Sequence, residues 1–259
     1  MEKAWTPSHS WGLAGIVALM PLSTWWTLAS GHALFSWLLN LGLIMAFLAI
    51  AGHGVLGLWR GVLIDNRNVI SLSRLQLVVW TVIVLSAFFT ASLWNLQMGL
   101  DDALAIKLPT ELWILMGIST TSLVGSPLIL GGKKVQDPDV AEFDATKKSI
   151  AAQGDDPALI DHKGLVLVNA DPRQARWSDL FTGEETGNGG HVDMAKVQMF
   201  FFTLIVAIAY AVALGKLFMA TRAGGFDAFP NMDQSLVSLI GISHAGYLTS
   251  KGIPHSQTA

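Results

Sequence analysis

The chain has 259 residues, of which 52% are hydrophobic and only 14% are charged, and its mean hydropathy is +0.49. A soluble domain of this length carries fewer apolar and more charged residues, so the composition predicts a membrane protein. A net charge of -3 gives no basic footprint of the kind that binding to nucleic acid requires, so we expect no nucleic-acid partner. The sequence contains no cysteine, which excludes disulfides, thiolate metal sites and cysteine nucleophiles.

Two apolar runs open the chain, over residues 11–29 and about 34–59. Each is long enough to cross about 30 Å of hydrocarbon as a helix. A cleavable signal peptide is the alternative for the first run, because residues 28–33 loosely resemble a small-residue cleavage site. The bulky pair Trp25–Trp26 stands where small residues should lie, so we expect a retained transmembrane helix.

Four further apolar runs have the length and composition of membrane helices. A polar junction precedes the first of them, and loops that contain Asp, Lys, Pro or Gly separate the others. The four runs predict helices over about residues 74–96, 111–130, 196–220 and 234–250.

The composition changes abruptly over residues 131–195, which hold seven Lys or Arg against twelve Asp or Glu. A strand-length apolar run at 164–170 ends at Asp171–Pro172 and predicts a small α+β insert. About 65 residues are close to the lower limit for an independent core, so we expect the insert to lean on the membrane helices or on neighbouring subunits. Residues 184–190 are expected to form a flexible loop, with Glu184–Glu185 as a solvated acidic pair.

Lys and Arg mark one side of the predicted helices. The junction at residues 60–74 holds three arginines, whereas the loop at residues 30–32 holds no basic residue. Basic residues in short loops favour the cytoplasmic side of a bacterial inner membrane. Both termini and the insert are therefore predicted to be cytoplasmic. The expected organisation is four membrane helices in residues 1–130, the insert at 131–195, two membrane helices in 196–250 and a tail at 251–259.

An internal repeat relates the two pairs of later helices. The stretch at 74–84 recurs at 196–206, and the run at 112–119 recurs at 236–243. Residues 196–250 are therefore expected to repeat 74–130 as a hairpin that crosses the membrane in the same sense. The predicted fold is an all-α polytopic membrane protein with six transmembrane helices, a parallel repeat of two-helix hairpins and a small cytoplasmic α+β insert.

Polar residues at equivalent positions of the repeat are candidates for a pathway. Arg74 and Lys196 stand at the start of equivalent helices, where a long cationic side chain commonly anchors a helix by reaching to the interface. Gln76 and Gln198 lie just inside the apolar runs and each needs a hydrogen-bond partner. They either bond to a neighbouring helix or line a pore.

The second helix of each hairpin is rich in small and hydroxyl residues. Small residues four apart allow close helix packing, whereas hydroxyls and histidine can also line a hydrated path. His53 is a second histidine within a predicted span. The helix-packing candidates are Gly117, Thr121, Gly125, Gly241 and Ala245, and the candidates for packing or for a pathway are Ser119, Thr120, Ser243 and His244.

No catalytic or cofactor motif is present. The sequence lacks a phosphate-binding loop, a dinucleotide fingerprint, paired-histidine zinc spacing and a nucleophile elbow. We therefore expect no enzyme activity, catalytic residue, cofactor or metal site. The expected function is a homo-oligomer in the inner membrane that forms a pore or transport pathway for ions or small solutes. The alternative is a structural or anchoring subunit whose insert, residues 131–195, docks a cytoplasmic protein.

Overall fold

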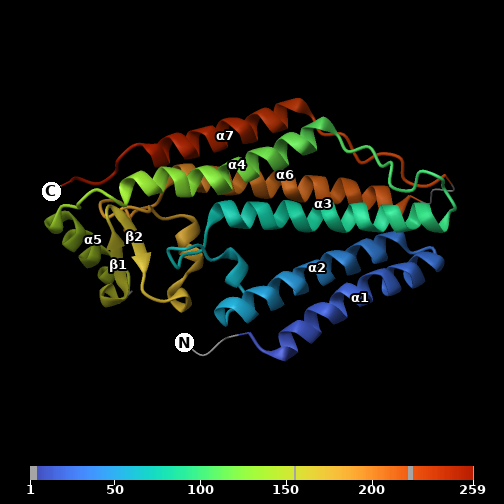
Figure 1. Cartoon of the computed structure of the whole chain (residues 1–259). Helices are drawn as coiled ribbons and strands as arrows, with labels where there is room; N and C mark the ends of the chain where they lie inside the picture. Colours follow the sequence, from blue (N-terminus) through green and yellow to red (C-terminus); the bar gives the residue numbers. More distant parts are fainter. Residues whose placement is uncertain (1–4, 155, 221–223, 259) are drawn as a thin grey trace. The chain divides into compact units, whose positions relative to one another are not determined.

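The computed structural model describes residues 5–154, 156–220 and 224–258, and most of them are helical (Figure 1). Short 3-10 turns connect several of the elements. The α-helices are α1 (Pro7–Ala29), α2 (Ala33–Leu56), α3 (Leu72–Gln97), α4 (Thr110–Lys133), α5 (Val140–Ala152), α6 (Met194–Met219) and α7 (Gln234–Gly252). The strands are β1 (Ile160–Lys163) and β2 (Val166–Asn169).

Five of these helices, α1, α2, α3, α4 and α6, are long and apolar enough to cross a membrane. The prediction of a multi-pass membrane protein is supported by these helices. The helix α7 has 19 residues and is not among the five found in the described ranges. Its apolar run is interrupted by His244 and ends at Lys251. A sixth span and the repeat therefore stay predictions.

The chain divides into two compact units. The first unit comprises residues 1–62, 78–116 and 204–237, and the second comprises residues 63–77, 117–203 and 238–259. The helices α3, α4, α6 and α7 each contribute residues to both units.

A line of buried polar side chains holds helices of the first unit together. Asn40 of α2 accepts a hydrogen bond from Thr24 of α1 at 3.0 Å and donates one to Thr90 of α3 at 2.9 Å. Trp37 of α2 donates its indole N–H to Ser86 of α3 at 3.0 Å. In lipid, such bonds between helices replace water as the partner of polar groups.

Close backbone contact fixes the end of α2. Gly52 and Gly61 approach so closely that a Cβ on Gly61 would lie 2.5 Å from the carbonyl oxygen of Gly52. His53, in the last turn of α2, bonds to His9 of α1 at 2.8 Å and stacks on Trp59. His53 thus has a local partner within the first unit.

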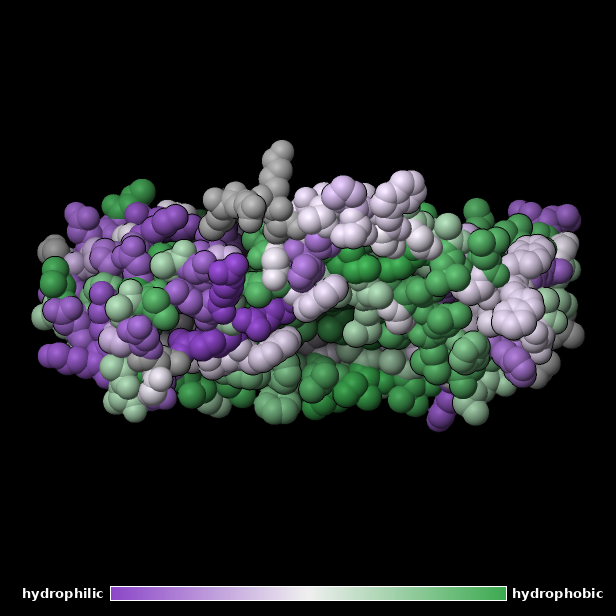
Figure 2. Space-filling view, turned by 90° about the horizontal axis from the view of Figure 1, so that it is seen from below, coloured by the Kyte–Doolittle hydropathy of each residue, from purple (hydrophilic) through white to green (hydrophobic). Residues whose placement is uncertain are grey.

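The insert forms a small core within the second unit. The strands β1 and β2 pair antiparallel, and Phe143 and Ile150 of α5 pack with Ile160 of β1 and Leu167 of β2. Asp139 caps α5 by accepting the backbone N–H of Glu142. The predicted strand at 164–170 is confirmed as β2. Figure 2 shows hydrophilic residues gathered over α5 and the β-hairpin, and hydrophobic residues over the long helices.

Candidate functional site: a buried charge cluster

Seven charged side chains meet inside the second unit and form the charge cluster. The four cations are 4–5% exposed, two of the carboxylates are 10% and 3% exposed, and the third is 17% exposed. Ions buried to this extent require paired charges, because their desolvation costs several kcal/mol each, roughly. The members are Asp65, Arg67, Lys133, Glu184, Glu185, Lys196 and Lys251.

Glu184 is the centre of the charge cluster because three cations share its carboxylate. Its Oε1 lies 3.0 Å from Arg67 Nη2 and 3.1 Å from Lys196 Nζ. Its Oε2 lies 2.6 Å from Lys251 Nζ. Burial alone would raise the pKa of Glu184, but the charges of the three cations outweigh it and hold the pKa well below its usual range. The carboxylate is therefore ionised at neutral pH.

Arg67 is held by the loop before α3. The Arg67 guanidinium bonds to Asp65 at 2.9 Å through Nε, and the backbone carbonyl of Arg67 accepts from Asn169 of β2 at 2.9 Å. Burial favours the neutral form, but the attraction of Glu184 and Asp65 is stronger and raises the pKa of Arg67. This loop therefore joins the insert through both charge and backbone bonds.

A second ion pair joins α4 to the insert. Lys133, in the last turn of α4, donates to the carboxylate of Glu185 and to the backbone carbonyls of Lys251 and Ile253, at 2.6 and 2.7 Å for the carbonyls. Glu185 also accepts the backbone N–H of His255 at 2.8 Å. The insert therefore leans on the ends of α4 and α7 of its own chain, in agreement with its small size.

Lys196 does not serve as an interfacial anchor. It is 3% exposed, and its Nζ donates to the backbone carbonyls of Asp179 and Thr182 at 3.1 and 2.7 Å as well as contacting Glu184. Asp193 caps the start of α6 by accepting the backbone N–H of Lys196 at 3.1 Å. Arg74, the residue proposed as equivalent in the repeat, is half-buried.

A line of polar side chains runs along α4 and α7 to the charge cluster, and we call it the polar file. His244 Nδ1 and Ser122 Oγ share a hydrogen bond of 2.6 Å. Two turns further along α7, Lys251 donates to Ser126 and, at 2.5 Å, to the hydroxyl of Tyr247. All five residues are buried. Lys251 belongs to both the polar file and the charge cluster.

The two glutamines of the proposed repeat differ in environment. Gln76 is 1% exposed and donates to Thr203 of α6 at 2.7 Å, while its Oε1 has no partner. Gln198 is exposed. The structure therefore brings Gln76 into the interior of the second unit and leaves Gln198 on the outside.

The hydroxyl-bearing and small candidate residues also differ in burial. Ser119 and Ser243 are buried at 1% and 5% exposed, whereas Thr120 is exposed. Added Cβ atoms on Gly125 and Gly241 would lie 3.7 Å from side chains of the partner helix, which is ordinary packing distance. The residues Gly117, Thr121 and Ala245 are exposed.

The prediction that Glu184 and Glu185 form a solvated pair is wrong. Both carboxylates are buried, because Arg67, Lys133 and Lys251 reach them from segments far away in the sequence. The sequence shows lysines at helix ends and an acidic pair in a glycine-rich loop, but no local pattern indicates that they pair with one another. No group of three metal-binding side chains occurs in the described part of the chain.

The chain matches no protein-family model, no curated protein and no solved structure. Function is therefore inferred from the contacts of the described residues.

Proposed function

We propose that the protein is a multi-pass inner-membrane protein that forms a pathway for ions or small solutes, and that the polar file is part of this pathway. The observation that carries the proposal is Lys251, a buried lysine whose ammonium connects Ser126 and Tyr247 to the carboxylate of Glu184. Ionisable side chains within membrane helices are costly and commonly mark routes for ions, protons or substrates.

Buried polar atoms without partners support a hydrated interior. Ser73 Oγ and Gln76 Oε1 of α3 and Ser243 Oγ of α7 are buried and make no hydrogen bond within the described residues. An unpaired polar group in a dry interior costs about 1–3 kcal/mol. Water within the second unit would satisfy all three atoms.

The number of spans and their orientation in the membrane are also part of the proposal. In it, α7 is the sixth span, and the insert and both termini lie in the cytoplasm, on the side with more basic residues. Assembly into a homo-oligomer stays a prediction. Gly117, Thr121 and Ala245 are exposed and would be accessible to a second copy.

The proposal is tested by flux into liposomes that contain the purified full chain. Dye-reported proton, potassium and chloride fluxes are compared for the wild type, Lys251→Met and Lys216→Met. Lys216 is an exposed lysine in the last turn of α6, so its variant controls for loss of a charge. We expect flux in the wild type and Lys216→Met and at least a tenfold lower rate in Lys251→Met, about the effect of 1.4 kcal/mol. No flux of any ion in the wild type would reject an ion pathway, and equal flux in both variants would reject the role of Lys251 in it.

A second candidate function is an anchor for a cytoplasmic protein. It is favoured by large apolar side chains exposed on the insert and at the start of α6, including Trp177 at 56%, Val192 at 65% and Met194 at 69%. A photo-crosslinking residue at position 177 tests it in living cells. One specific crosslinked protein, lost in Val192→Ser, would support the anchor, and crosslinking to lipid alone would reject it.

A further inference from the structure

Large apolar side chains are exposed around the start of α6. Val192 is 65% exposed, and Met194, the first residue of α6, is 69% exposed. Trp177, which opens the 3-10 turn η4 (Trp177–Leu180), is 56% exposed. Phe201 is 52% exposed and lies seven residues after Met194, on the same face of α6. We call Trp177, Val192, Met194 and Phe201 the apolar patch.

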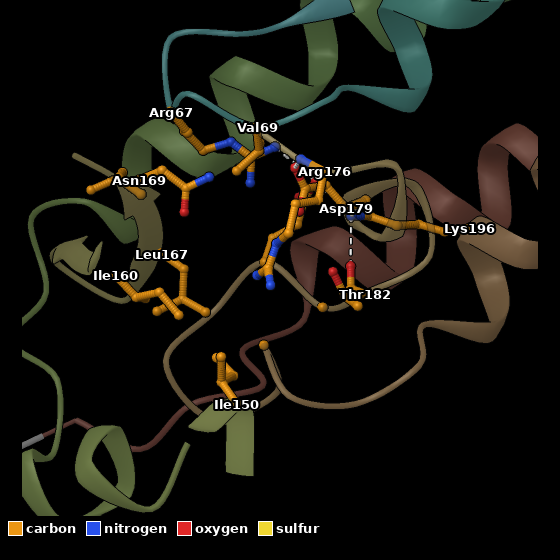
Figure 3. Close-up of a pocket in the computed structure, with 14 residues that line it drawn as sticks. Arg67, Val69, Ile150, Ile160, Leu167, Asn169, Arg176, Asp179, Thr182 and Lys196 are labelled. Carbon is orange, nitrogen blue, oxygen red and sulfur yellow. Dashed lines mark hydrogen bonds and ion pairs between the residues drawn. The ribbon is translucent and has the colours of Figure 1, made fainter. Parts of the chain in front are cut away.

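Hydrogen bonds hold the turn η4 against the first turn of α6. Lys196 Nζ donates to the backbone carbonyls of Asp179 and Thr182 at 3.1 and 2.7 Å. Figure 3 shows the side chain of Lys196 reaching from α6 towards Thr182. The backbone N–H of Asp193 donates to the carbonyl of Phe181 at 2.7 Å. The place where α6 begins therefore also fixes the position of η4.

The position of the apolar patch favours lipid as its partner. The helix α6 is long and apolar enough to cross a membrane, so its first turn would lie near one edge of the hydrocarbon. The exposed face of α6 continues at helical spacing from Met194 and Phe201 to Ile205 and Ile208, which are 59% and 55% exposed. Trp residues gather at this level of a bilayer, because the ring is apolar and its N–H is polar. Trp177 has the chemistry that this level requires.

We propose that the start of α6 and the turn η4 lie in the headgroup region of the bilayer, where Trp177, Val192 and Met194 contact lipid directly. The second candidate function gives the same side chains to a cytoplasmic protein. Continuity of the patch with the exposed apolar face of α6 favours lipid instead. The inference rests on the membrane part of the proposed function, because α6 must cross the bilayer, but it does not require transport.

Single spin labels on the full chain in liposomes of phosphatidylcholine and phosphatidylglycerol test the proposal. The chain contains no cysteine, so Trp177→Cys, Val192→Cys, Val140→Cys and Ile205→Cys each carry one label. Collisions with oxygen, which concentrates in lipid, and with a water-soluble nickel chelate measure the depth of each label. Val140→Cys is the matched control for Val192→Cys, because Val140 is 71% exposed and shares its face of α5 with the exposed Asp144.

We expect the labels at positions 177 and 192 within roughly 10 Å of the headgroup boundary, the usual depth of interfacial apolar side chains. The label at position 140 should lie in water, and the label at position 205 should lie deeper, in hydrocarbon. Labels at 177 and 192 that meet the nickel chelate as often as the label at 140 would overturn the proposal, while a label at 205 in hydrocarbon would keep α6 as a span. Low accessibility to both oxygen and nickel at 177 and 192 would place the patch against another protein chain and would also overturn it. A label at 205 in water would contradict both the span and the inference that rests on it.

Discussion

Lys251 Nζ lies 2.6 Å from Glu184 Oε2 and connects the last turn of α7 to a loop of the insert. The two residues are 67 positions apart in the sequence, and the same carboxylate also contacts Arg67 and Lys196. One glutamate therefore holds the start of α6, the end of α7 and the loop before α3 within the second unit. Removing one charged partner leaves the other charges buried without full compensation, which costs more free energy than the whole set of pairs contributes. The first two predictions follow from this cost.

Glu184→Gln should lower the free energy of unfolding by about 3–5 kcal/mol, because three buried cations lose their shared anion. Thermal or denaturant unfolding in detergent measures the loss. Asp144→Asn, on an exposed position of α5, is the matched control and should change stability by less than about 0.5 kcal/mol. The double variant Glu184→Gln, Lys251→Met should lose less than the sum of the two single variants. Strict additivity would show that the two side chains do not interact.

The contribution of Glu184 to stability should depend on pH. Its pKa is lower in the folded state than in the unfolded chain, where it is about 4.3. The stabilisation is therefore fully present above about pH 5 and is lost as the pH falls through the folded-state pKa. The difference in unfolding free energy between the wild type and Glu184→Gln should be constant from about pH 5 to 8 and should narrow below about pH 4. A difference that grows on acidification would contradict the charge assignment.

Asn40→Leu should lower the stability of the first unit by about 1 kcal/mol. The substitution removes the bonds from Asn40 to Thr24 and Thr90 in the membrane interior, where such bonds contribute about 0.6–1.7 kcal/mol. Ser30→Ala is the control, because the exposed Ser30 hydroxyl bonds only to its own helix, at the carbonyl of Trp26. Unfolding in mixed detergent micelles measures both variants, and equal stability of the two would show that the Asn40 bonds contribute nothing.

Gly61→Ala should lower the free energy of unfolding by about 1–3 kcal/mol, the usual range for overpacking. The new Cβ would lie 2.5 Å from the Gly52 carbonyl oxygen, and backbone atoms cannot move aside cheaply. Gly42→Ala, in the interior of α2 with no atom within 4 Å of the new Cβ, should be neutral or stabilising by up to about 1 kcal/mol. If Gly61→Ala is no less stable than Gly42→Ala, the backbones at Gly52 and Gly61 are free to separate and the close contact contributes nothing.

The sequence predicts the long helices well because each has its own apolar run that is long enough to cross a membrane. Five of the six expected helices have the length and composition of a span, and the predicted strand at 164–170 is confirmed as β2. The helix α7 is less apolar because its buried face carries His244 and Lys251, which find partners in α4 and the insert. Its polarity reflects tertiary contacts, which a hydropathy pattern does not describe.

The charge cluster could not be predicted from local patterns. Each of its lysines looks like an interfacial anchor, and Glu184–Glu185 looks like a solvated turn. Several of the pairings join residues far apart in the sequence, such as Lys133 with Glu185, 52 positions away, and with the carbonyl of Lys251, 118 positions away. Local patterns also do not distinguish Gln76 from Gln198, which occupy matching positions in the proposed repeat but differ in burial.

The most direct test of the pathway is the water accessibility of the polar file. The chain contains no cysteine, so single-cysteine variants need no altered background. Ser122→Cys places a thiol on the buried face of α4, and Val124→Cys places one on the exposed face of the same helix, where Val124 is 56% exposed. The variants are reconstituted into liposomes and treated with a membrane-impermeant thiol reagent, which requires water to form the reactive thiolate. The pathway predicts that Ser122→Cys is modified at least about tenfold faster than Val124→Cys and that Lys251→Met alters its rate. Modification of Ser122→Cys no faster than of Val124→Cys would contradict a hydrated pathway along α4 and α7.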